Sequence, residues 1–245
     1  TGKQKDYLSR IQFSGETLLA TINEILDFSK IESGKIFIEK ENFNLDEVLH
    51  NLSSLVAYRA LEKGLDLVLN IAADIPRHLV GDSQRLGQVL LNLVGNAIKF
   101  TSAGSVTVQV KMQTQTPRQI TLEFSVQDTG IGLSGQQISR LFQPFNQADT
   151  SISRKYGGTG LGLTISQRLV NMMGGKITVS SQPGQGSTFS FVLTLERQTE
   201  ESTRSLMSLP ELKGLPTLVL DDHPATLGFL QNALEAFGFA VTTAG

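Results

Sequence analysis

Residues 82–101 predict a helix whose two sides carry different chemistry. Asn92, Asn96 and Lys99 share one face by their spacing. An amide oxygen can ligate a hard cation, and a lysine ammonium can contact a phosphate. The alternative is a polar helix end that faces solvent, and this helix alone does not decide between the two. The other side is an apolar stripe with three- and four-residue spacing, formed by Leu86, Val89, Leu90, Leu93, Val94 and Ala97.

Two glycine-containing stretches could bind other parts of the same ligand. Asp128 follows a predicted strand and precedes Gly130 and Gly132, so its carboxylate could accept a hydrogen bond from the exocyclic amine of a flat ring such as adenine. The glycines of 157–162 open a predicted helix, and a helix start offers free N–H groups and a positive dipole end to phosphate. Together with the polar side of the 82–101 helix, these stretches predict a site for ATP and Mg²⁺.

Other catalytic patterns fit the chain less well. The segment 130–135 matches the dinucleotide-binding spacing GxGxxG, but the helix after it is short and no second strand ending in an acidic residue follows. The sequence contains no P-loop motif, and no hydrolase triad can be assembled from it. His50, His78 and His223 are too scattered to suggest a zinc cluster.

Composition narrows the class of protein. The 245 residues correspond to one or two domains, and a hydrophobic content of 40% is enough to build a core. A net charge of −2 gives no general attraction to nucleic acid or to anionic membranes. The sequence has no cysteine, which excludes disulfides and thiolate metal sites and fits a reducing compartment. No apolar run reaches the roughly 20 residues that cross a bilayer, and no signal peptide is visible.

Hydrophobic periodicity predicts the elements that position these residues. Residues 4–32 form a long amphipathic helix with a heptad-like apolar seam, which favours a helical bundle or a dimer. Residues 76–81 and 142–156 are expected to be loops. Strand and helix patterns alternate in the remainder: strands at 35–40, 65–71, 105–112, 119–126, 176–180 and 187–195, and helices at 45–63, 82–101, 134–141 and from the 157–162 glycines to residue 173.

The last part of the chain changes character. Residues 197–214 are rich in Ser, Thr and Glu without periodicity, which is typical of a linker. A strand at 216–220, a helix at 225–237 and a strand at 239–243 then predict the start of a βαβ unit. An acidic pair, Asp221 and Asp222, follows the first of these strands and could either hold Mg²⁺ or simply initiate the helix.

Four motifs together resemble those of sensor histidine kinases. Their order and spacing match the N, G1, F and G2 boxes of that family over about 100 residues, which is far more specific than any one of them. The resemblance extends from residue 1 to about 195, with 27–35 similar to the end of the second dimerisation helix of hybrid kinases. The motifs are Asn92-x-x-x-Asn96-Ala97-x-Lys99-Phe100-Thr101, Asp128-x-Gly130-x-Gly132, Leu141-Phe142-x-Pro144-Phe145 and Gly158-Thr-Gly160-Leu-Gly162-Leu.

The resemblance implies a fold and a division into domains. The ATP-binding domain of that family is an α+β, two-layer α/β sandwich of the Bergerat type, in which a mixed sheet packs on helices. The implied division is a partial dimerisation domain at 1–34, the catalytic ATP-binding domain at 35–196, a linker at 197–214 and the start of a receiver domain at 215–245.

The resemblance also implies roles for residues near the adenine and the metal. Asn96 would ligate Mg²⁺, with Asn92 as a second ligand or as an orienter, and Lys99 would contact phosphate. Asp128 would bind the adenine amine in a pocket that the glycines of its turn, Gly130 and Gly132, shape.

Further roles are implied for the phosphate-binding turn, the lid and the receiver part. Residues 142–156 would form a mobile lid, which Phe142 and Phe145 anchor and which offers Arg154 to the γ-phosphate. In the receiver part, Asp221 and Asp222 would hold Mg²⁺. The triphosphate would lie along Gly158, Thr159, Gly160, Leu161 and Gly162.

The activity that the resemblance implies is a protein histidine kinase of a two-component phosphorelay. Related ATPases of this fold have at the position of Asn92 a glutamate that activates water, and an asparagine cannot act as that base. Transfer to a protein is therefore favoured over hydrolysis. The family's phosphoacceptor histidine stands in an H-E-x-R-T-P context, which His50, His78 and His223 do not match, so we expect the acceptor outside this sequence.

The implied partners are ATP, a second copy bound through the 4–32 helix, and a response regulator or phosphotransfer protein, without nucleic acid. A cytoplasmic location is implied, with membrane contact only through upstream segments. Two alternatives remain open: a non-catalytic, kinase-like regulator that binds a partner kinase through the 4–32 helix, and a chaperone- or repair-type ATPase, which Asn92 disfavours.

Overall fold

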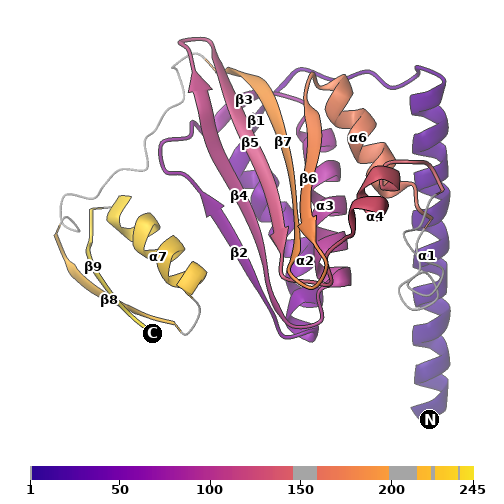
Figure 1. Ribbon diagram of the computed structural model, residues 1–245, viewed down its shortest axis with the longest axis horizontal. Coiled ribbons are helices and arrows are strands. Elements are labelled where there is room, and N and C mark those ends of the chain that lie inside the picture. The colour runs from indigo at the N-terminus through magenta and orange to yellow at the C-terminus, as the bar shows by residue number, and fades with distance from the viewer. Residues whose placement is uncertain (1, 146–158, 199–213, 222–223, 237) are drawn as a thin grey trace.

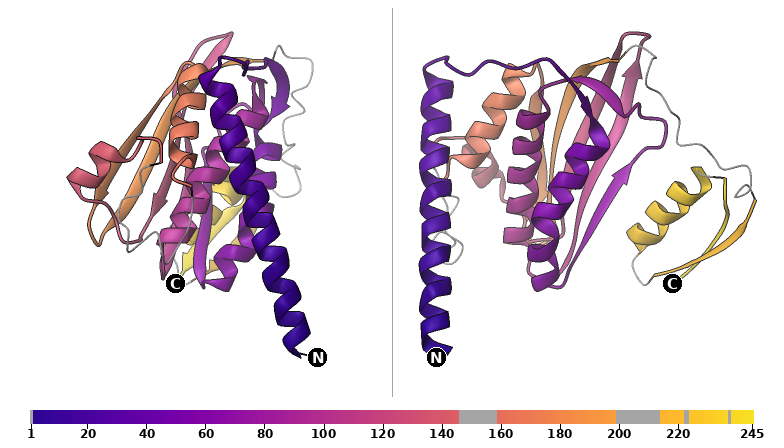
Figure 2. Two further views of the ribbon diagram at one scale, coloured as in Figure 1. Left: turned by 90° about the vertical axis from the view of Figure 1, so that its right-hand side faces the viewer. Right: turned by 180° about the vertical axis from the view of Figure 1, so that it is seen from behind.

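A mixed sheet packed on helices forms the centre of the molecule (Figure 1). The computed structural model describes residues 2–145, 159–198, 214–221, 224–236 and 238–245. The helices α2 (Leu45–Glu62), α3 (Ser83–Phe100) and α6 (Gly162–Met172) cover one face of the sheet, and α1 (Gly2–Glu32) lies beyond them. Figure 2 shows the same succession from behind: α1, the helix layer, the sheet, and then the unit formed by residues 214–245.

The sheet has seven strands, and its path is β1-β3-β7-β5-β4-β2, with β6 paired to β7. Within this sheet, only the β2–β4 pair is parallel among the residues that the structure describes. The short β3 and the longer β6 share one edge of β7, because β3 pairs near Arg197 and β6 pairs from Gly186 to Val192. The strands are β1 (Glu41–Asn44), β2 (Leu65–Ile71), β3 (His78–Gly81), β4 (Gly104–Gln115), β5 (Gln119–Asp128), β6 (Lys176–Gln182) and β7 (Gly186–Arg197).

The core lies between this sheet and the helix layer. Alternate residues of β4 and β5 are buried, as the period-two pattern predicts for a strand with one covered face. The rings of Phe124 and Phe191 stack across β5 and β7 with centroids 5.1 Å apart. The predicted apolar stripe of α3 is buried throughout, each residue being at most 5% exposed: Leu86, Val89, Leu90, Leu93, Val94 and Ala97. The predicted α+β sandwich is confirmed.

Two strand predictions are wrong at one edge of the sheet. Residues 35–40 form no strand, and pairing begins at Glu41, opposite Gly81. The local alternation is real, since Ile36 is buried and Phe37 is 79% exposed, but the N–H of Glu39 donates to the side chain of Asp82 instead of to a strand. The predicted 76–81 loop contains β3, which is too short to show a period and gains its identity from pairing with β1 and β7.

The C-terminal residues form the predicted strand–helix–strand order. Strand β8 (Pro216–Leu220) pairs in parallel with β9 (Ala240–Ala244), and α7 (Pro224–Ala236) connects them. Helix α7 also contacts β2 of the main sheet. Most of the predicted linker, 199–213, lies outside the described residues.

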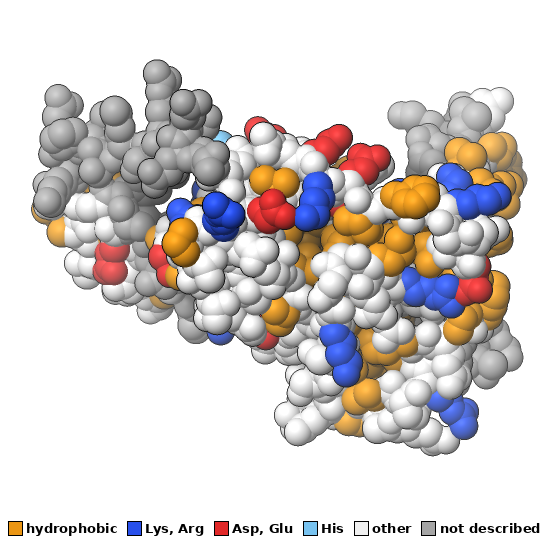
Figure 3. Space-filling view, turned by 90° about the horizontal axis from the view of Figure 1, so that it is seen from above, with side chains coloured by type: hydrophobic (Ala, Val, Ile, Leu, Met, Phe, Trp, Pro, Cys, Tyr) orange, Lys and Arg blue, Asp and Glu red, His pale blue; other side chains and the backbone are white. Residues whose placement is uncertain are grey.

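The surface shows apolar side chains among charged ones. The view from above looks onto the end of the molecule that the segment 33–40 crosses, and apolar side chains gather there between α1 and the 214–245 unit (Figure 3). Along the part of the chain that the structure describes, no helix combines the length and apolar character that a bilayer crossing requires.

We expect Leu90→Ala to lower the free energy of unfolding by about 2–5 kcal/mol, because Leu90 is fully buried between α3 and the sheet and its loss leaves a cavity. The matched control is Leu91→Ala on the next position of α3, where the side chain is 37% exposed and the cost should stay under about 1 kcal/mol. Urea unfolding followed by circular dichroism measures both. Equal losses would contradict the packing described.

Candidate functional site

Helix α3 positions the polar residues that the sequence singles out. Its start is fixed by the N-cap Asp82, whose side chain accepts from the N–H of Arg85 at 2.9 Å. Its buried stripe sets the rotation of the helix about its axis. Asn92 and Asn96 consequently lie on the side that α6 approaches, and Lys99 follows in the last turn.

The two amides form a relay that continues into α6. Nδ2 of Asn96 donates to Oδ1 of Asn92 at 3.3 Å, and Nδ2 of Asn92 donates to the hydroxyl of Ser166 at 2.8 Å. At the start of α6, a Cβ added to Gly162 would lie 2.5 Å from Oδ1 of Asn92. A side chain at position 162 would displace the amide of Asn92, so the two helices are in close contact here.

The turn before α6 is held by the core on one side and by α1 on the other. The N–H of Leu161 donates to the hydroxyl oxygen of Thr159 at 3.1 Å, and Gly160 has a φ of +74°, which favours glycine. The side chain of Leu161 is fully buried and anchors the turn in the core. The hydroxyl of Thr159 in turn donates to the carboxylate of Glu24 on α1. Gly158 and Arg154, two of the predicted site residues, lie outside the described residues.

Asp128 is the last residue of β5, and its turn lies next to the C-terminal end of α3. Its Oδ1 accepts from the N–H of Gly130 at 2.8 Å, and the residue is 6% exposed. Burial raises the pKa of Asp128, while the N–H groups of Gly130 and Ser187 act in the opposite direction. A Cβ on Gly130 would lie 2.5 Å from the carbonyl oxygen of Phe100, so this turn rests directly on the C-terminus of α3.

Gly132, in the same turn, is required by a contact on the opposite side. It has a φ of +65°, and a Cβ there would lie 1.9 Å from the carbonyl oxygen of Gln182, at the end of β6. The N–H of Gly184 donates to the carbonyl of Ile131 at 2.7 Å, which ties the turn to the β6–β7 connection. The 128–132 turn is thus enclosed between α3 and the end of β6.

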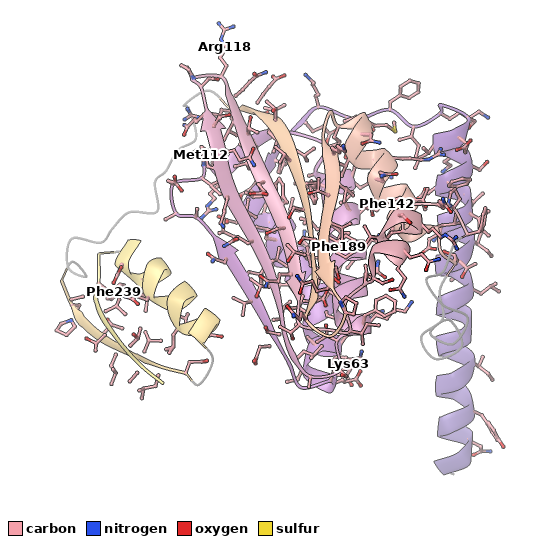
Figure 4. All side chains as sticks on the ribbon, viewed as in Figure 1. Lys63, Met112, Arg118, Phe142, Phe189 and Phe239 are labelled. Atoms are coloured by element: carbon pink, nitrogen blue, oxygen red, sulfur yellow. The ribbon has the colours of Figure 1, made fainter. Side chains whose placement is uncertain are left out.

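Two lysines lie at the C-terminal end of α3. The ammonium of Lys63 donates to the carbonyl oxygens of Ile98 at 2.7 Å, Lys99 at 3.0 Å and Thr101 at 3.3 Å. Figure 4 shows Lys63 at the lower end of the helix layer. Burial lowers the pKa of Lys99, and the nearby carboxylate of Glu24 raises it. A cation with a lowered pKa beside an acid is suited to a site that receives an anion.

The predicted lid begins at Phe142, whose carbonyl accepts from the hydroxyl of Thr164 on α6 at 3.1 Å. Figure 4 places this residue near α6 on the side toward α1. Phe145 is 66% exposed and has a φ of +58°, and its ring meets that of Phe28 edge-on with centroids 6.0 Å apart. The remaining predicted lid residues, 146–156, lie outside the described residues.

The structure brings together most of the described candidates. Asn92 and Asn96 lie against the turn of Thr159 to Gly162, and the end of α3 lies against the turn of Asp128. Asp221 does not join them, because it follows β8 in the 214–245 unit on the other side of the sheet (Figure 1). Its predicted partner, Asp222, lies outside the described residues.

Sequence reasoning missed three residues of this site: Ser166, Lys63 and Glu24. Ser166 is an ordinary helix residue in sequence, and its contact with Asn92 depends on how α3 packs against α6. Lys63 was placed at the end of α2, but nothing local shows that its side chain reaches α3. Glu24 lies on the predicted seam helix, where a charged residue normally faces solvent, so only the packing of α1 shows its contact with Thr159.

The oxygen ligands available here fit a magnesium ion that is bound partly by the phosphates of a nucleotide. Among the described residues, no group of three or more His, Cys, Asp or Glu could hold a metal ion without help. Mg²⁺ commonly takes a few protein oxygens together with water and substrate phosphates. In the relay of amides, Oδ1 of Asn92 already accepts from Asn96, so Oδ1 of Asn96 is the oxygen best placed to become such a ligand.

Comparison with known proteins shows which family and which proteins this chain is similar to. Residues 81–197 match the family described as histidine kinase-, DNA gyrase B-, and HSP90-like ATPase. The chain is 46% identical over 242 residues to the sensor histidine kinase GacS of Pseudomonas protegens, which covers 99% of this chain and 26% of that protein. It is 48% identical over 196 residues to the signal transduction histidine-protein kinase BarA of Escherichia coli K12, which covers 80% of this chain and 21% of that protein.

A solved structure has a similar fold. Full-length ShkA in complex with AMPPNP superimposes with a TM-score of 0.79 at 29% identity, and the match covers 100% of this chain and 49% of that one. The chain spans 26% of the length of GacS and 21% of BarA, the curated relatives compared here.

We expect Lys63→Met to lower the free energy of unfolding by about 1–2 kcal/mol, because it removes charge-assisted hydrogen bonds from the end of α3. Faster amide hydrogen exchange at residues 98–101 should accompany the loss. The matched control is Lys40→Met, since Lys40 is 72% exposed in its ion pair with Glu196 and its replacement should cost under about 1 kcal/mol. Unchanged exchange at 98–101 would show that Lys63 does not hold this end.

Proposed function

Because residues 81–197 belong to the histidine kinase-, DNA gyrase B- and HSP90-like ATPases, and the chain has the catalytic ATP-binding core of a hybrid sensor histidine kinase, we propose that it transfers the γ-phosphoryl group of ATP to a protein histidine. One observation carries the proposal. A single buried helix, α3, presents amides to one glycine turn and its C-terminus to the other.

Asp128 is the residue that recognises the base. Its carboxylate is 6% exposed and is held by the N–H of Gly130, so it is fixed before a ligand arrives. A buried, ionised carboxylate accepts strongly from an exocyclic amine, since water competes little for it. Gly130 and Gly132 keep the surrounding turn close against the protein on both sides.

The phosphates are bound at the other end of the site. The positive dipole end of α6 and the hydroxyl of Thr159 face the turn that contains Gly160. Lys99 supplies a cation in the last turn of α3, where burial lowers its pKa and the carboxylate of Glu24 acts in the opposite direction. Gly158 and Arg154 belong to this proposal from the sequence pattern alone.

Mg²⁺ would be held by Oδ1 of Asn96 together with phosphate oxygens. When bound, the ion neutralises charge that develops on the transferred phosphoryl group. Asn92 is assigned as the orienter of Asn96, because its own Oδ1 accepts the hydrogen bond from Asn96. Neither amide can abstract a proton from water, so the site favours transfer to a protein nucleophile over hydrolysis.

A homodimer through α1 is part of the proposal. Seam residues of this helix are exposed in the single chain, among them Ile11 at 68% and Leu18 at 60%. A long helix with an exposed apolar seam gains free energy by pairing with another helix. A response regulator or phosphotransfer protein is proposed as the later acceptor, and the cytoplasmic location stays a prediction.

The domain division also remains a proposal: dimerisation helix at 1–34, catalytic domain at 35–196, linker at 197–214 and receiver start at 215–245. The parallel pairing of β8 with β9 supports the last of these. Within it, Asp221 and Asp222 are proposed to hold a second Mg²⁺.

We expect Asp128→Asn to weaken ATP binding about 10-fold or more, because it replaces a charge-assisted hydrogen bond and turns one acceptor oxygen into a donor. Isothermal titration calorimetry with Mg-ATP measures the change. The control is Asp74→Asn, at an exposed position of the same domain, which should bind as the unaltered chain does. Equal affinity of all three proteins would place the base elsewhere.

As the pH is lowered, ATP affinity should also begin to fall at a pH above about 3.9, the ordinary pKa of an aspartate. The pKa of Asp128 is raised, and only the ionised carboxylate accepts from the base, so protonation removes the contact as pH drops through that raised value. Titrations between pH 7.5 and 5 measure the slope. Asp128→Asn should lack this component, and an identical slope in both proteins would assign the dependence to another group, including the nucleotide.

Incubation with γ-labelled ATP should leave this chain unlabelled. His50 lies on α2 and His78 lies in β3, inside the domain that binds the nucleotide, and none of the histidines has the acceptor context. Label should appear on a separately supplied histidine-bearing dimerisation domain. Acid-labile phosphate on this chain itself would contradict the assignment, and absence of Mg-dependent ATP binding would favour the non-catalytic regulator.

A further inference from the structure

We propose that Lys63 is a positioning residue of the base-binding site, because its ammonium holds the end of α3 on which the turn of Asp128 rests. The inference rests on the proposed function and deepens it. Lys63 lies at the end of α2. Its side chain donates to the carbonyl oxygens of Ile98, Lys99 and Thr101. In this proposal it touches neither base nor phosphate and acts through the backbone of α3.

The fold brings Lys63 to the end of α3. Helix α2 ends here, since Lys63 is its C-cap and Gly64 has a φ of +63°, which favours glycine. The chain then enters β2, whose first residue, Leu65, pairs with Gly104, the first residue of β4. Because α3 leads directly into β4, this parallel register places the last turn of α2 beside the last turn of α3.

The hydrogen bonds of Lys63 have only one direction. An ammonium carries three donors and no acceptor, whereas a carbonyl oxygen only accepts. The last carbonyls of a helix have no partner within the helix, and a positive charge there also interacts favourably with the helix dipole. The ammonium of Lys63 lies 2.7, 3.0 and 3.3 Å from three carbonyl oxygens at this end of α3, so it fixes the backbone there.

The base-binding turn contacts the same stretch of backbone. The carbonyl of Phe100, which lies between two of the residues that Lys63 contacts, accepts from the N–H of Ile131 at 3.4 Å. A Cβ on Gly130 would lie 2.5 Å from that oxygen, so the turn and the helix end are in direct contact. The N–H of Gly130 in turn donates to the carboxylate of Asp128 at 2.8 Å. A shift of the helix end would therefore move the carboxylate that is proposed to accept from the base.

Two contrasting explanations predict a different effect on base recognition. In the first, Lys63 only stabilises the fold, and a folded variant that lacks it still distinguishes one base from another. In the second, Lys63 acts through Lys99, whose carbonyl it contacts and whose side chain is proposed to bind phosphate. Its loss would then weaken the binding of every triphosphate, whatever the base.

The test compares ATP with purine riboside triphosphate, which is ATP without the exocyclic amine. The unaltered chain should prefer ATP about 10-fold or more, because only ATP carries the amine that donates to Asp128. Lys63→Met should reduce this preference about 3- to 10-fold, the effect of one hydrogen bond. The affinity for ATP should fall, while the affinity for the analogue changes less than about twofold. Isothermal titration calorimetry of the full chain measures both ligands.

The matched control is Val56→Ala, which removes buried side-chain volume from the same helix two turns before Lys63. It lowers stability without removing a donor from the end of α3, so the preference for ATP should equal that of the unaltered chain. Lys63→Arg keeps a positive charge and N–H donors and should retain most of the preference. Circular dichroism melts confirm that each variant is folded.

A double-mutant cycle tests whether Lys63 acts through Asp128. In an Asp128→Asn background the charge-assisted hydrogen bond to the amine is absent, so Lys63→Met should cause no further loss of the preference for ATP. Additive losses in the double mutant would overturn a role that runs through this carboxylate.

The outcomes separate the inference from the function on which it rests. If the unaltered chain binds neither triphosphate, or binds both equally, the assignment of ATP and of its base is wrong. If it prefers ATP and folded Lys63→Met keeps that preference, the function stands and the role of Lys63 is overturned. Equal weakening of both ligands would place the action of Lys63 at the phosphates, and an equal loss in Val56→Ala would reduce it to stability. Either result would also overturn the role.

Discussion

The structure depends on the burial of one side of α3. Its apolar stripe is at most 5% exposed against the sheet, and each such side chain contributes on the order of 1.5–3 kcal/mol when removed from water. This burial fixes the rotation of the helix and therefore the direction of every residue on the other side. The polar residues of α3 are oriented by the hydrophobic core, because the buried side of the helix determines where its other side points.

The ends of α3 extend this control to the rest of the site. At the C-terminus, Phe100 offers its carbonyl to the N–H of Ile131 at 3.4 Å, and the turn of Asp128 rests on it. Midway, Asn92 touches the start of α6. Two segments more than 30 residues apart in sequence thus meet the same rigid helix. A displacement of α3 would move the turn of Asp128 and the start of α6 together, and with them both ends of the proposed site.

Local pattern predicted what depends on local physics. The α3 stripe and the strand–helix–strand order near the C-terminus follow from periods within one segment, and the structure has both. Strands β1 and β3 escaped prediction because four residues cannot show a period and because their hydrogen bonds come from distant segments.

For the candidate site, too, the sequence predicted some residues and missed others. The motif residues were found from spacing, because glycines, amides and an acid at fixed intervals are unusual in a helix or a turn. Their supporting partners were not. Ser166 and Lys63 reach the site through side chains from other helices, and the close contacts of Gly132 and Gly162 are set by tertiary packing. Sequence therefore indicated which residues to propose for the site, and the structure adds the contacts that hold them.

The contacts of α1 connect the helical seam to the nucleotide site. Glu24 accepts from Thr159 in the glycine turn, while Phe28 meets Phe145 at the start of the lid and Arg168 of α6 from its other side. Glu32 pairs with the same arginine. These residues lie on one side of α1, and the seam residues Ile11 and Leu18 stay exposed. The carboxylate of Glu24 occupies the hydroxyl of Thr159, the same donor that the proposed function assigns to a phosphate. In the single chain, the hydrogen bond between Thr159 and Glu24 therefore joins α1 to the turn that is proposed to bind phosphate.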